Sequence, residues 1–349
     1  MTKSTFDTSD ASVIGVGVIG AGKAGALFGR AVNAAHNGHL VALAAATQQE
    51  ADAVGATLEV DRCTGDWKTL LDDPAVQAIF IASPTFLHHE MTVAAARAGK
   101  HVLCDKPLCL TSQQADEMLE ACREAKVLFM VGFVERFNAA FRVARERIRQ
   151  GEIGKPVMVS ARRSHPPRQG SWIMDDKKSG GAFLHTGCHN IDLVQWLFNS
   201  PITHLSAEQT ESGNFPGFTD VSAVIGSMEN GVLVSLMESY AHPTGLPMGV
   251  DRSMEILGTK GALYLDLLRS PVTLCTEDGW KYQDVLSWVD AGGELSGALT
   301  EETKYFLDCV QQNKTPDAAP AEEGKRTIAV FEAAQRAAKE GRRVQVESN

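Results

Sequence analysis

The sequence lacks any C-x-x-C pair, although seven cysteines are spread along its 349 residues. An odd number of cysteines without paired spacing indicates neither a zinc knuckle nor a disulfide framework, so we expect reduced thiols and no metal site. Basic residues are in deficit, because 43 acids face 33 lysines and arginines and give a formal net charge of -10. A surface that binds nucleic acid needs clustered basic side chains, so the composition argues against such a partner.

Long apolar runs are also absent. Each run is broken by glycine or by a charge well short of the length that crosses a bilayer. The first twelve residues have neither the basic start nor the apolar stretch of a signal peptide, and they contain no twin arginine. With 44% hydrophobic and 22% charged residues, we expect a cytoplasmic globular protein that does not bind membranes.

The first part of the chain alternates short apolar runs with helix-like segments. Residues 13–19 form a continuous uncharged run whose non-glycine residues are all β-branched, which is typical of a strand buried on both faces. Strict alternation of strand and helix predicts a doubly wound parallel sheet, the Rossmann form of α/β domain, at 12–132 after a flexible tail at 1–11. Further strands are expected at 40–46, 76–82, 102–104 and 127–131, and helices at 24–36, 66–71, 88–98 and 111–126.

Beyond residue 136 the rhythm changes. A helix at 139–149 is followed by a series of strand-like runs, which predicts an α+β domain at 133–301 with a large, mainly antiparallel open sheet. Helices at 300–311 and 322–340 close the chain, and we expect the segment 302–349 to pack back on the body. The strands are expected at 157–163, 206–211, 220–227, 231–240, 252–257 and 262–267, with one further helix at 190–198.

A glycine loop, Gly20-Ala21-Gly22-Lys23-Ala24-Gly25, lies between the first predicted strand and the first predicted helix. In a dinucleotide fold the first glycine permits a tight turn, the second lets a pyrophosphate approach the backbone, and the third allows the helix to pack on the strand. A small-residue turn without a ligand is the alternative, but the strand–loop–helix context favours a cofactor. The predicted cofactor-binding residues here are Gly20, Gly22, Lys23, Ala24 and Gly25.

The choice between NAD and NADP stays open. The second predicted strand should end in an acid that binds the ribose hydroxyls of NAD, and residues 44–48 contain no acid. They contain no arginine to clamp a 2′-phosphate either. The absent acid removes the repulsion that excludes NADP, and Thr47 or Gln48 can hydrogen-bond its phosphate. The cofactor is therefore predicted as NAD or NADP, with a slight preference for NADP.

A lysine stands in the segment Asp105-Lys106-Pro107, at the end of another apolar run. Proline fixes its own φ and biases the residue before it towards an extended conformation, which fixes the direction of Lys106. Most lysines are solvated loop residues, and that is the alternative here. Because the segment follows a predicted strand, Lys106 should lie at the same sheet edge as the glycine loop and handle protons there.

Taken in order, the motifs resemble those of the Gfo/Idh/MocA family (glucose–fructose oxidoreductase and inositol dehydrogenase) over almost the whole chain. The resemblance implies a nicotinamide-dependent oxidoreductase that acts on a sugar, polyol or cyclitol. It also implies a homodimer or homotetramer that assembles through the open face of the second sheet. The motifs are residues 20–25, Ser83-Pro84-Thr85 with His88, Asp105-Lys106-Pro107, residues 132–137, and residues 180–182 leading to 187–192.

The resemblance assigns the proton-transfer groups. It places Lys106 near the nicotinamide and the reacting hydroxyl, where a neighbouring cationic ring would disfavour its charged form. Asp105 stands where the family usually has glutamate, and it should contact the cofactor or orient the lysine. His189 matches the histidine usually credited with taking the hydroxyl proton, and Asp192 lies one helical turn later. The alternative for His189 is a packed residue at a helix N-terminus.

One position departs from the family pattern. Many relatives have aspartate four residues before this histidine, where the present chain has His185. An aspartate would raise the basicity of the imidazole and hold its tautomer, which a second histidine does not do in the same way. The sequence therefore leaves two alternatives. Either Asp192 orients His189, or Lys106 is the main base.

Further residues of the pocket are predicted by position. Glu135 matches a substrate-contacting polar position, whereas Arg136 is expected to make a structural ion pair. Successive strand residues face opposite sides, so Arg162 or Arg163, but not both, can point at the pocket, where an anionic or heavily hydroxylated substrate would suit. Trp172 could stack on a sugar ring. The positions that resemble cofactor contacts are Ser83, Pro84, Thr85 and His88, with helix capping as the alternative for His88. The predicted substrate-binding residues are Lys106, Glu135, Arg163, Trp172, His185 and His189.

The leading hypothesis is a dehydrogenase or reductase of a sugar or cyclitol in which Lys106 and His189 handle the proton. A non-catalytic protein that senses a dinucleotide with the same fold is one alternative. The other is a sugar–sugar oxidoreductase that recycles a permanently held NADP between two substrates.

Overall fold

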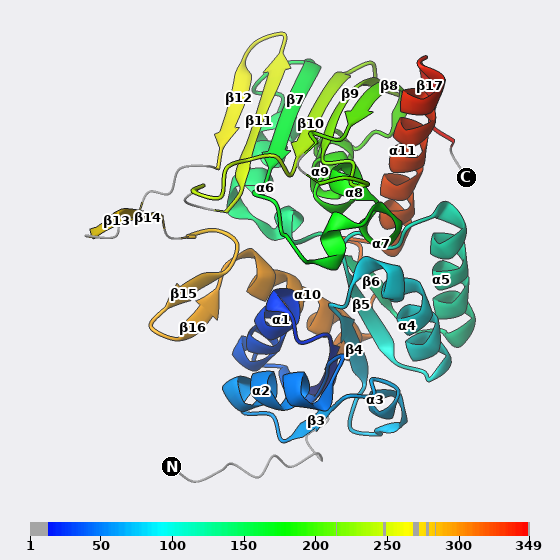
Figure 1. The fold of residues 1–349 in the computed structure, drawn as a ribbon, viewed down its shortest axis with the longest axis vertical. Coiled ribbons are helices and arrows are strands. Elements are labelled where there is room, and N and C mark those ends of the chain that lie inside the picture. The colour runs from blue at the N-terminus through cyan, green and yellow to red at the C-terminus, as the bar shows by residue number, and fades with distance from the viewer. Residues whose placement is uncertain are drawn as a thin grey trace.

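The computed structural model describes residues 13–213, 215–246, 249–267, 272–276, 279–282 and 284–347. These residues form two large sheets, one in the N-terminal part and one in the C-terminal part, with helices packed against each (Figure 1). The predicted tail at 1–11 lies outside the described residues. Among the helices that are described, none combines the length and the apolar character needed to cross a membrane.

Six parallel strands form the N-terminal sheet: β1 (Ile14–Ile19), β2 (Gly38–Ala44), β3 (Arg62–Thr64), β4 (Ala78–Ile81), β5 (His101–Asp105) and β6 (Phe129–Gly132). They lie in the order β3-β2-β1-β4-β5-β6. Every residue of β1 is buried, as expected for a central strand between two layers of helices. The order reverses between β1 and β4, which is the Rossmann arrangement, so the predicted doubly wound sheet is confirmed.

Five helices connect these strands: α1 (Lys23–Ala34), α2 (Gln48–Leu58), α3 (Thr69–Asp72), α4 (Thr85–Arg97) and α5 (Ser112–Ala125). The sequence analysis missed α2 and the short β3 after it. Only Ala51, Gly55 and Leu58 of α2 are buried, so its apolar stripe is narrow. Its start is nevertheless encoded, because the hydroxyl of Thr47 accepts the N–H of Glu50 at 3.2 Å.

Seven strands form the C-terminal sheet: β7 (Pro156–Ser164), β8 (Ile202–Thr210), β9 (Val221–Met228), β10 (Leu233–Ser239), β11 (Asp251–Gly258), β12 (Ala262–Asp266) and β17 (Val344–Gln345). Their order is β12-β11-β7-β10-β9-β8-β17. The pair β7–β10 is parallel and the other pairs are antiparallel. This confirms the mainly antiparallel sheet.

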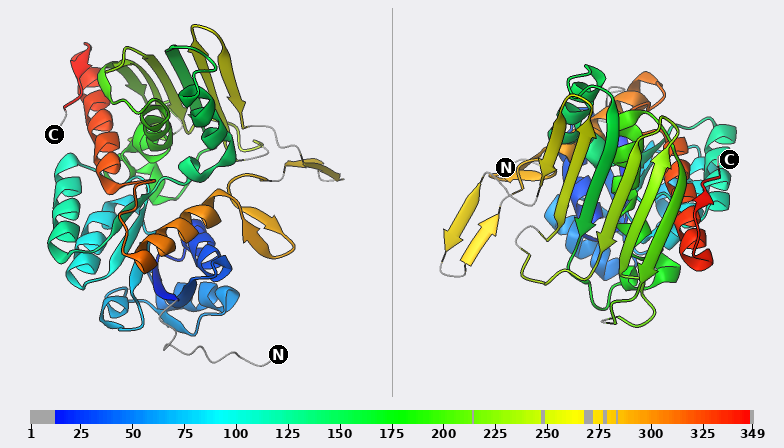
Figure 2. Two further views of the ribbon diagram at one scale, coloured as in Figure 1. Left: turned by 180° about the vertical axis from the view of Figure 1, so that it is seen from behind. Right: turned by 90° about the horizontal axis from the view of Figure 1, so that it is seen from above.

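Helices cover one face of this sheet and leave the other open (Figure 2). The covering helices include α8 (Gly181–His185), α9 (Cys188–Phe198) and α11 (Ala321–Glu340). On the open face, Ile225, Leu233 and Met237 are 68%, 55% and 53% exposed. An apolar sheet face of this kind is typical of a surface that meets another protein.

The remaining helices are the 3₁₀ turns η1 (Val134–Phe137) and η2 (Trp172–Met174), with α6 (Ala139–Arg149), α7 (Asp176–Ser179) and α10 (Ala298–Gln312). Two small hairpins lie apart from the sheets: β13 (Thr273–Thr276) with β14 (Gly279–Tyr282), and β15 (Val289–Ala291) with β16 (Glu294–Ser296). The chain returns to the N-terminal sheet through α10, where the rings of Phe306 and Phe80 meet edge to face at 5.7 Å. The two parts are therefore packed together.

Candidate active site

The three loop glycines have different surroundings. Gly20 has φ +116°, and a Cβ there would lie 2.5 Å from the carbonyl oxygen of Ala82. A Cβ on Gly25 would lie 1.7 Å from the carbonyl oxygen of Gly20, so both positions require glycine. No atom lies within 4 Å of a Cβ placed on Gly22. That open space is where a pyrophosphate would approach the backbone.

The first turn of α1 adds unpaired donors to this space. Gly22 is its N-cap residue and supplies no side-chain cap, so the first N–H groups of the helix remain available to an anion. Lys23 and Ala24 occupy this turn. Lys23 is exposed, and its Nζ lies 5.5 Å from the ring centroid of Trp288, which belongs to the C-terminal part of the chain.

The end of β2 carries no charge. Residues 44–46 are alanines. The Thr47 hydroxyl caps α2 by accepting a hydrogen bond, which leaves its proton free to donate. The Gln48 amide is engaged with Asp52, Gly65 and the carbonyl oxygen of Cys63. Of the two predicted phosphate ligands, only Thr47 keeps an uncommitted donor.

The loops after β4 and β5 meet at one sheet edge, because Ile81 pairs with Cys104 in parallel register. Ser83-Pro84-Thr85 form the first loop. The hydroxyl oxygens of Ser83 and Thr85 are buried and have no hydrogen-bond partner among the described residues. Unpaired buried hydroxyls are costly, so these two groups fit a bound polar ligand at the same edge.

His88 ties these two loops together. It is 1% exposed, and its ring nitrogens lie 2.9 Å from the carbonyl oxygens of Pro107 and Ser83. Burial lowers its pKa, although the backbone contacts act in the opposite direction. Both nitrogens are occupied by the backbone, so His88 positions the loops instead of making the predicted polar contact with a cofactor.

Lys106 spans the two parts of the chain. Its backbone N–H donates to Oδ1 of Asp105 at 2.8 Å, which ties this aspartate to the loop. Burial raises the pKa of Asp105, against the opposing effect of the neighbouring lysine. Nζ of Lys106 donates to the carbonyl oxygen of His185 at 3.2 Å, across 79 positions of sequence. An amine from the β5 loop therefore lies directly against α8.

His189 lies in the first turn of α9 and is 9% exposed. Its Nδ1 has no hydrogen-bond partner among the described residues. Burial lowers the pKa of His189 well below its ordinary value, and the charges of Arg163 and Lys106 lower it further. The ring is therefore neutral at pH 7, and its Nδ1 accepts no support from a carboxylate in the described part of the chain.

An aromatic wall, made of Trp172, His185, Tyr240 and His165, stands beside Lys106. Nδ1 of His185 lies 2.6 Å from the Tyr240 hydroxyl. The rings of Trp172 and His185 meet edge to face at 5.4 Å, and His165 stacks on Tyr240 at 5.4 Å. The predicted residues Trp172 and His185 are thus brought together. Tyr240 was not predicted, although it follows β10, whose parallel neighbour β7 ends just before His165.

Asp192 does not orient His189. Its carboxylate accepts hydrogen bonds from Arg136, one of them from Nε at 2.9 Å, and the same guanidinium also pairs with Glu323. The side chains of Asp192 and Arg136 are each 3% exposed. The expected ion pair of Arg136 is confirmed, and it uses the aspartate that was predicted to be catalytic. The sequence left two alternatives for the base. The ion pair between Asp192 and Arg136 contradicts the alternative in which Asp192 orients His189.

Glu135 is likewise committed to ion pairs and not to a substrate. Its carboxylate binds Arg163 at 2.9 Å and also Arg252, and all three residues are buried. Burial raises its pKa, but the two guanidinium groups outweigh this effect and hold it at about 2. Arg163 faces inward and Arg162 outward, as strand alternation predicts. The predicted contact of Glu135 with sugar hydroxyls is corrected to an ion cluster of one acid and two arginines.

A further buried acid lies two positions before Tyr240 in the chain. Glu238 on β10 is 1% exposed and accepts a hydrogen bond from the Asn190 amide at 2.8 Å, while Oε2 has no described partner. Burial raises its pKa to about 8. The sequence analysis missed this residue and Arg252, because inward-facing charges on strands cannot be distinguished by pattern from outward-facing ones.

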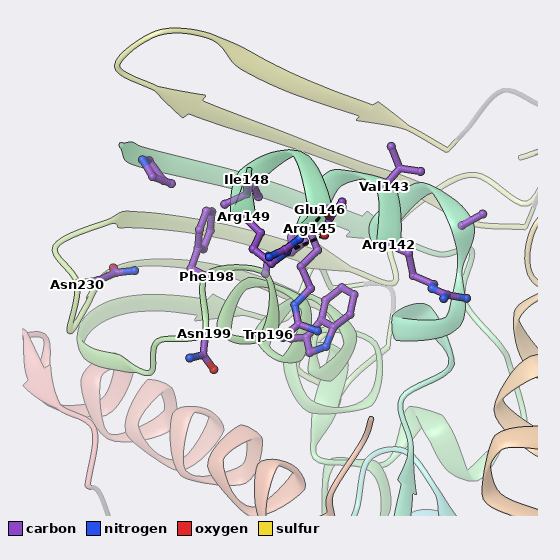
Figure 3. Close-up of a pocket in the computed structure, with 13 residues that line it drawn as sticks. Arg142, Val143, Arg145, Glu146, Ile148, Arg149, Trp196, Phe198, Asn199 and Asn230 are labelled. Atoms are coloured by element: carbon purple, nitrogen blue, oxygen red, sulfur yellow. Dashed lines mark hydrogen bonds and ion pairs between the residues drawn. The ribbon is translucent and has the colours of Figure 1, made fainter. Parts of the chain in front are cut away.

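A large open groove lies elsewhere, between α6 and α9 (Figure 3). Arg142, Arg145 and Trp196 line it, with none of the residues described above. The Arg145 guanidinium stacks over Trp196 at 4.3 Å. No group of acids, histidines and cysteines in the described part of the chain has the geometry to hold a metal ion. The predicted catalytic side chains lie instead where the loop after β5 meets the helices α8 and α9 of the C-terminal part.

Comparison with protein families gives two matches. A family model described as an oxidoreductase family with an NAD-binding Rossmann fold matches residues 14–133. A second, described as an oxidoreductase family C-terminal alpha/beta domain, matches residues 145–346. Together they span both sheets and the site between them.

Individual relatives are similar over nearly the whole chain. Myo-inositol 2-dehydrogenase of Thermotoga maritima is 28% identical over 339 residues, which cover 95% of this chain and 98% of that protein. Inositol 2-dehydrogenase 2 of Saccharopolyspora erythraea is 31% identical and covers 88% and 95%. The crystal structure of a probable dehydrogenase from Thermotoga maritima has a TM-score of 0.81 at 27% identity and covers 95% and 99%.

Proposed function

The chain belongs to the Gfo/Idh/MocA oxidoreductase family, and from that premise we propose that it transfers a hydride between NAD(P) and a hydroxyl or carbonyl carbon of a sugar or cyclitol. The observation that carries the proposal is the contact between Nζ of Lys106 and the His185 carbonyl oxygen at 3.2 Å. This contact supports the proposal because it brings an amine from the loop after β5 against α8 of the C-terminal part.

The cofactor fits the edge described above. Gly22 and the first turn of α1 would hold the pyrophosphate, Thr47 the adenosine ribose or its phosphate, and Ser83 and Thr85 the nicotinamide end. The bound nicotinamide supplies or accepts the hydride. Residues 44–48, at the end of β2, contain no carboxylate, so we propose that NADP is accepted as well as NAD.

Lys106 is proposed as the main proton-transfer group. During reduction its ammonium group donates a proton to the carbonyl oxygen as the hydride arrives, and during oxidation the amine takes that proton back. His189, whose neutral ring has no Nδ1 partner among the described residues, is proposed to hydrogen-bond the same oxygen and so hold the reacting carbon in place.

The proposal is tested by following absorbance at about 340 nm, the band of the reduced nicotinamide, with sugars, sugar acids and cyclitols and with both cofactors in turn. Turnover with at least one substrate is the expected result. Binding of cofactor without turnover across the whole panel would favour a sensing role instead.

The role of His189 gives a testable prediction. Replacing it with alanine should lower kcat/KM by about 10²-fold, because the substrate oxygen loses a positioning contact. The pH at which the rate is half-maximal should stay where it is, because His189 is proposed to position the substrate and not to transfer the proton. The pH–rate profiles of both proteins are compared; a displaced midpoint in His189→Ala would restore the histidine as the base.

We propose that the open face of the C-terminal sheet joins copies of the chain. Met237 lies in β10 near the middle of that sheet and is 53% exposed. Met237→Glu places a charge in the interface and should convert the oligomer to monomers, as measured by light scattering after size-exclusion chromatography. Val143→Glu, at a position 56% exposed on α6, is the matched control and should leave the oligomer intact. A wild-type protein that is already monomeric contradicts the proposal.

A further inference from the structure

The aromatic wall has a positively charged neighbour that the reaction does not use. The loop between β7 and η2 begins with His165 and ends at Trp172, both members of the wall. Arg168 lies between them, is exposed, and makes no ion pair among the described residues. Burial lowers the pKa of His165 and of His185, and the charge of Arg168 lowers both further; burial raises the pKa of the Tyr240 hydroxyl, and the charge of Arg168 opposes that rise, so it acts on three of the four wall residues.

The acids around the pocket do not neutralise this charge. Glu135 is shared by two arginines, which leaves one positive charge in excess in that cluster. Glu238 is bound to Asn190 and is largely protonated at pH 7, because burial holds its pKa at about 8. The carboxylate of Asp105 accepts a hydrogen bond from the backbone N–H of Lys106. Asp105 is also the acid nearest to that lysine in the sequence. The charged groups around Lys106 and the aromatic wall therefore carry an excess of positive charge, within a chain whose net charge is -10.

Resting on the proposed function, we infer that the substrate is a sugar acid, whose carboxylate binds Arg168 while its reacting hydroxyl faces Lys106. A guanidinium presents a planar pair of donors that matches a carboxylate, and this recognition is strongest where few other charges compete. Trp172, whose ring packs against His185, gives the apolar face of a sugar ring a surface to stack on. A neutral cyclitol would leave the arginine without a partner.

The test is a calorimetric titration of the cofactor-loaded protein with matched pairs of sugars. D-glucuronate is compared with D-glucose and D-galacturonate with D-galactose, because the members of a pair differ by one carboxylate. The acid should bind at least about tenfold more tightly, the size expected of one charge-assisted hydrogen-bonded pair. Arg168→Gln should abolish this preference and leave the affinity for the neutral sugar unchanged. Arg142→Gln, on α6 in the distant groove, removes the same charge and should retain the preference.

Turnover of the same sugars separates this inference from the proposed function. Preferred binding of the acids without hydride transfer would support the inference and count against the proposed function. Neutral sugars that bind as tightly as their acids, or a preference that survives in Arg168→Gln, would overturn the inference while the oxidoreductase activity stands. Absence of binding by both uronates would overturn it as well.

Discussion

Lys106→Met should lower kcat by about 10²- to 10⁴-fold, the usual contribution of a positioned acid–base group, while the Kd of the cofactor should change little. Methionine keeps most of the length and the apolar stem of lysine and removes its amine with the transferable proton. The backbone N–H that holds Asp105 is unaffected by the substitution, so the cofactor loop keeps its shape. Turnover is followed through the nicotinamide absorbance, and cofactor binding through the fluorescence of the reduced cofactor.

Two further variants show whether the loss in Lys106→Met comes from the missing proton or from the missing charge. Lys106→Arg keeps the charge but cannot release a proton near neutral pH, so it should not restore the rate. If it does, the lysine acts only through its charge. Lys339→Met, at an exposed position of α11, is the control for replacing a lysine with methionine and should leave kcat unchanged. Near-normal turnover in Lys106→Met would remove the amine from the mechanism.

The parallel sheet was predictable because its strands are buried on both faces. β1 appears in the sequence as one uncharged run of isoleucine, valine and glycine, and the helix of α6, Ala139–Arg149, was predicted with the bounds that the structure has. Such signals are local, since they depend on neighbouring residues alone. The helix α2 was missed although Thr47 and Glu50 form the S/T-x-x-E pattern of a helix start. Its apolar stripe was too weak to draw attention to the cap.

The candidate site was predictable only in part, for a physical reason. Motifs at strand ends place Lys106 and the glycine loop, because parallel strands bring their carboxyl ends to one edge. Ion pairing depends on partners that are distant in sequence. Asp192 was assigned to catalysis, yet its arginine lies 56 positions away, and Glu135 meets Arg252 across 117 positions. Sequence pattern identifies charged residues but not their partners.

Glu135→Gln gives the largest expected loss of stability. The amide cannot neutralise Arg163 and Arg252, whose side chains are 4% and 6% exposed, so two buried cations remain unpaired. Breaking a buried ion pair in this way costs about 3–5 kcal/mol. The matched control is Glu152→Gln, which breaks the exposed pair with Arg147 and should cost at most about 1 kcal/mol. The free energy of unfolding is compared from denaturant melts followed by circular dichroism.

The same cluster predicts a dependence on pH whose sign is fixed. The pKa of Glu135 is about 2 in the folded chain and near 4.5 when unfolded, so the unfolded state binds the proton first on acidification. The stabilisation is complete above pH 4.5 and is lost as the pH falls towards 2. Wild-type stability should therefore decline more steeply than that of Glu135→Gln over this interval. If the stabilities of the two proteins decline in parallel, Glu135 does not stabilise the fold through its charge. Adding Arg252→Met to Glu135→Gln should recover stability, because it removes one unpaired cation. If it recovers none, the buried ion cluster does not hold the two arginines as described.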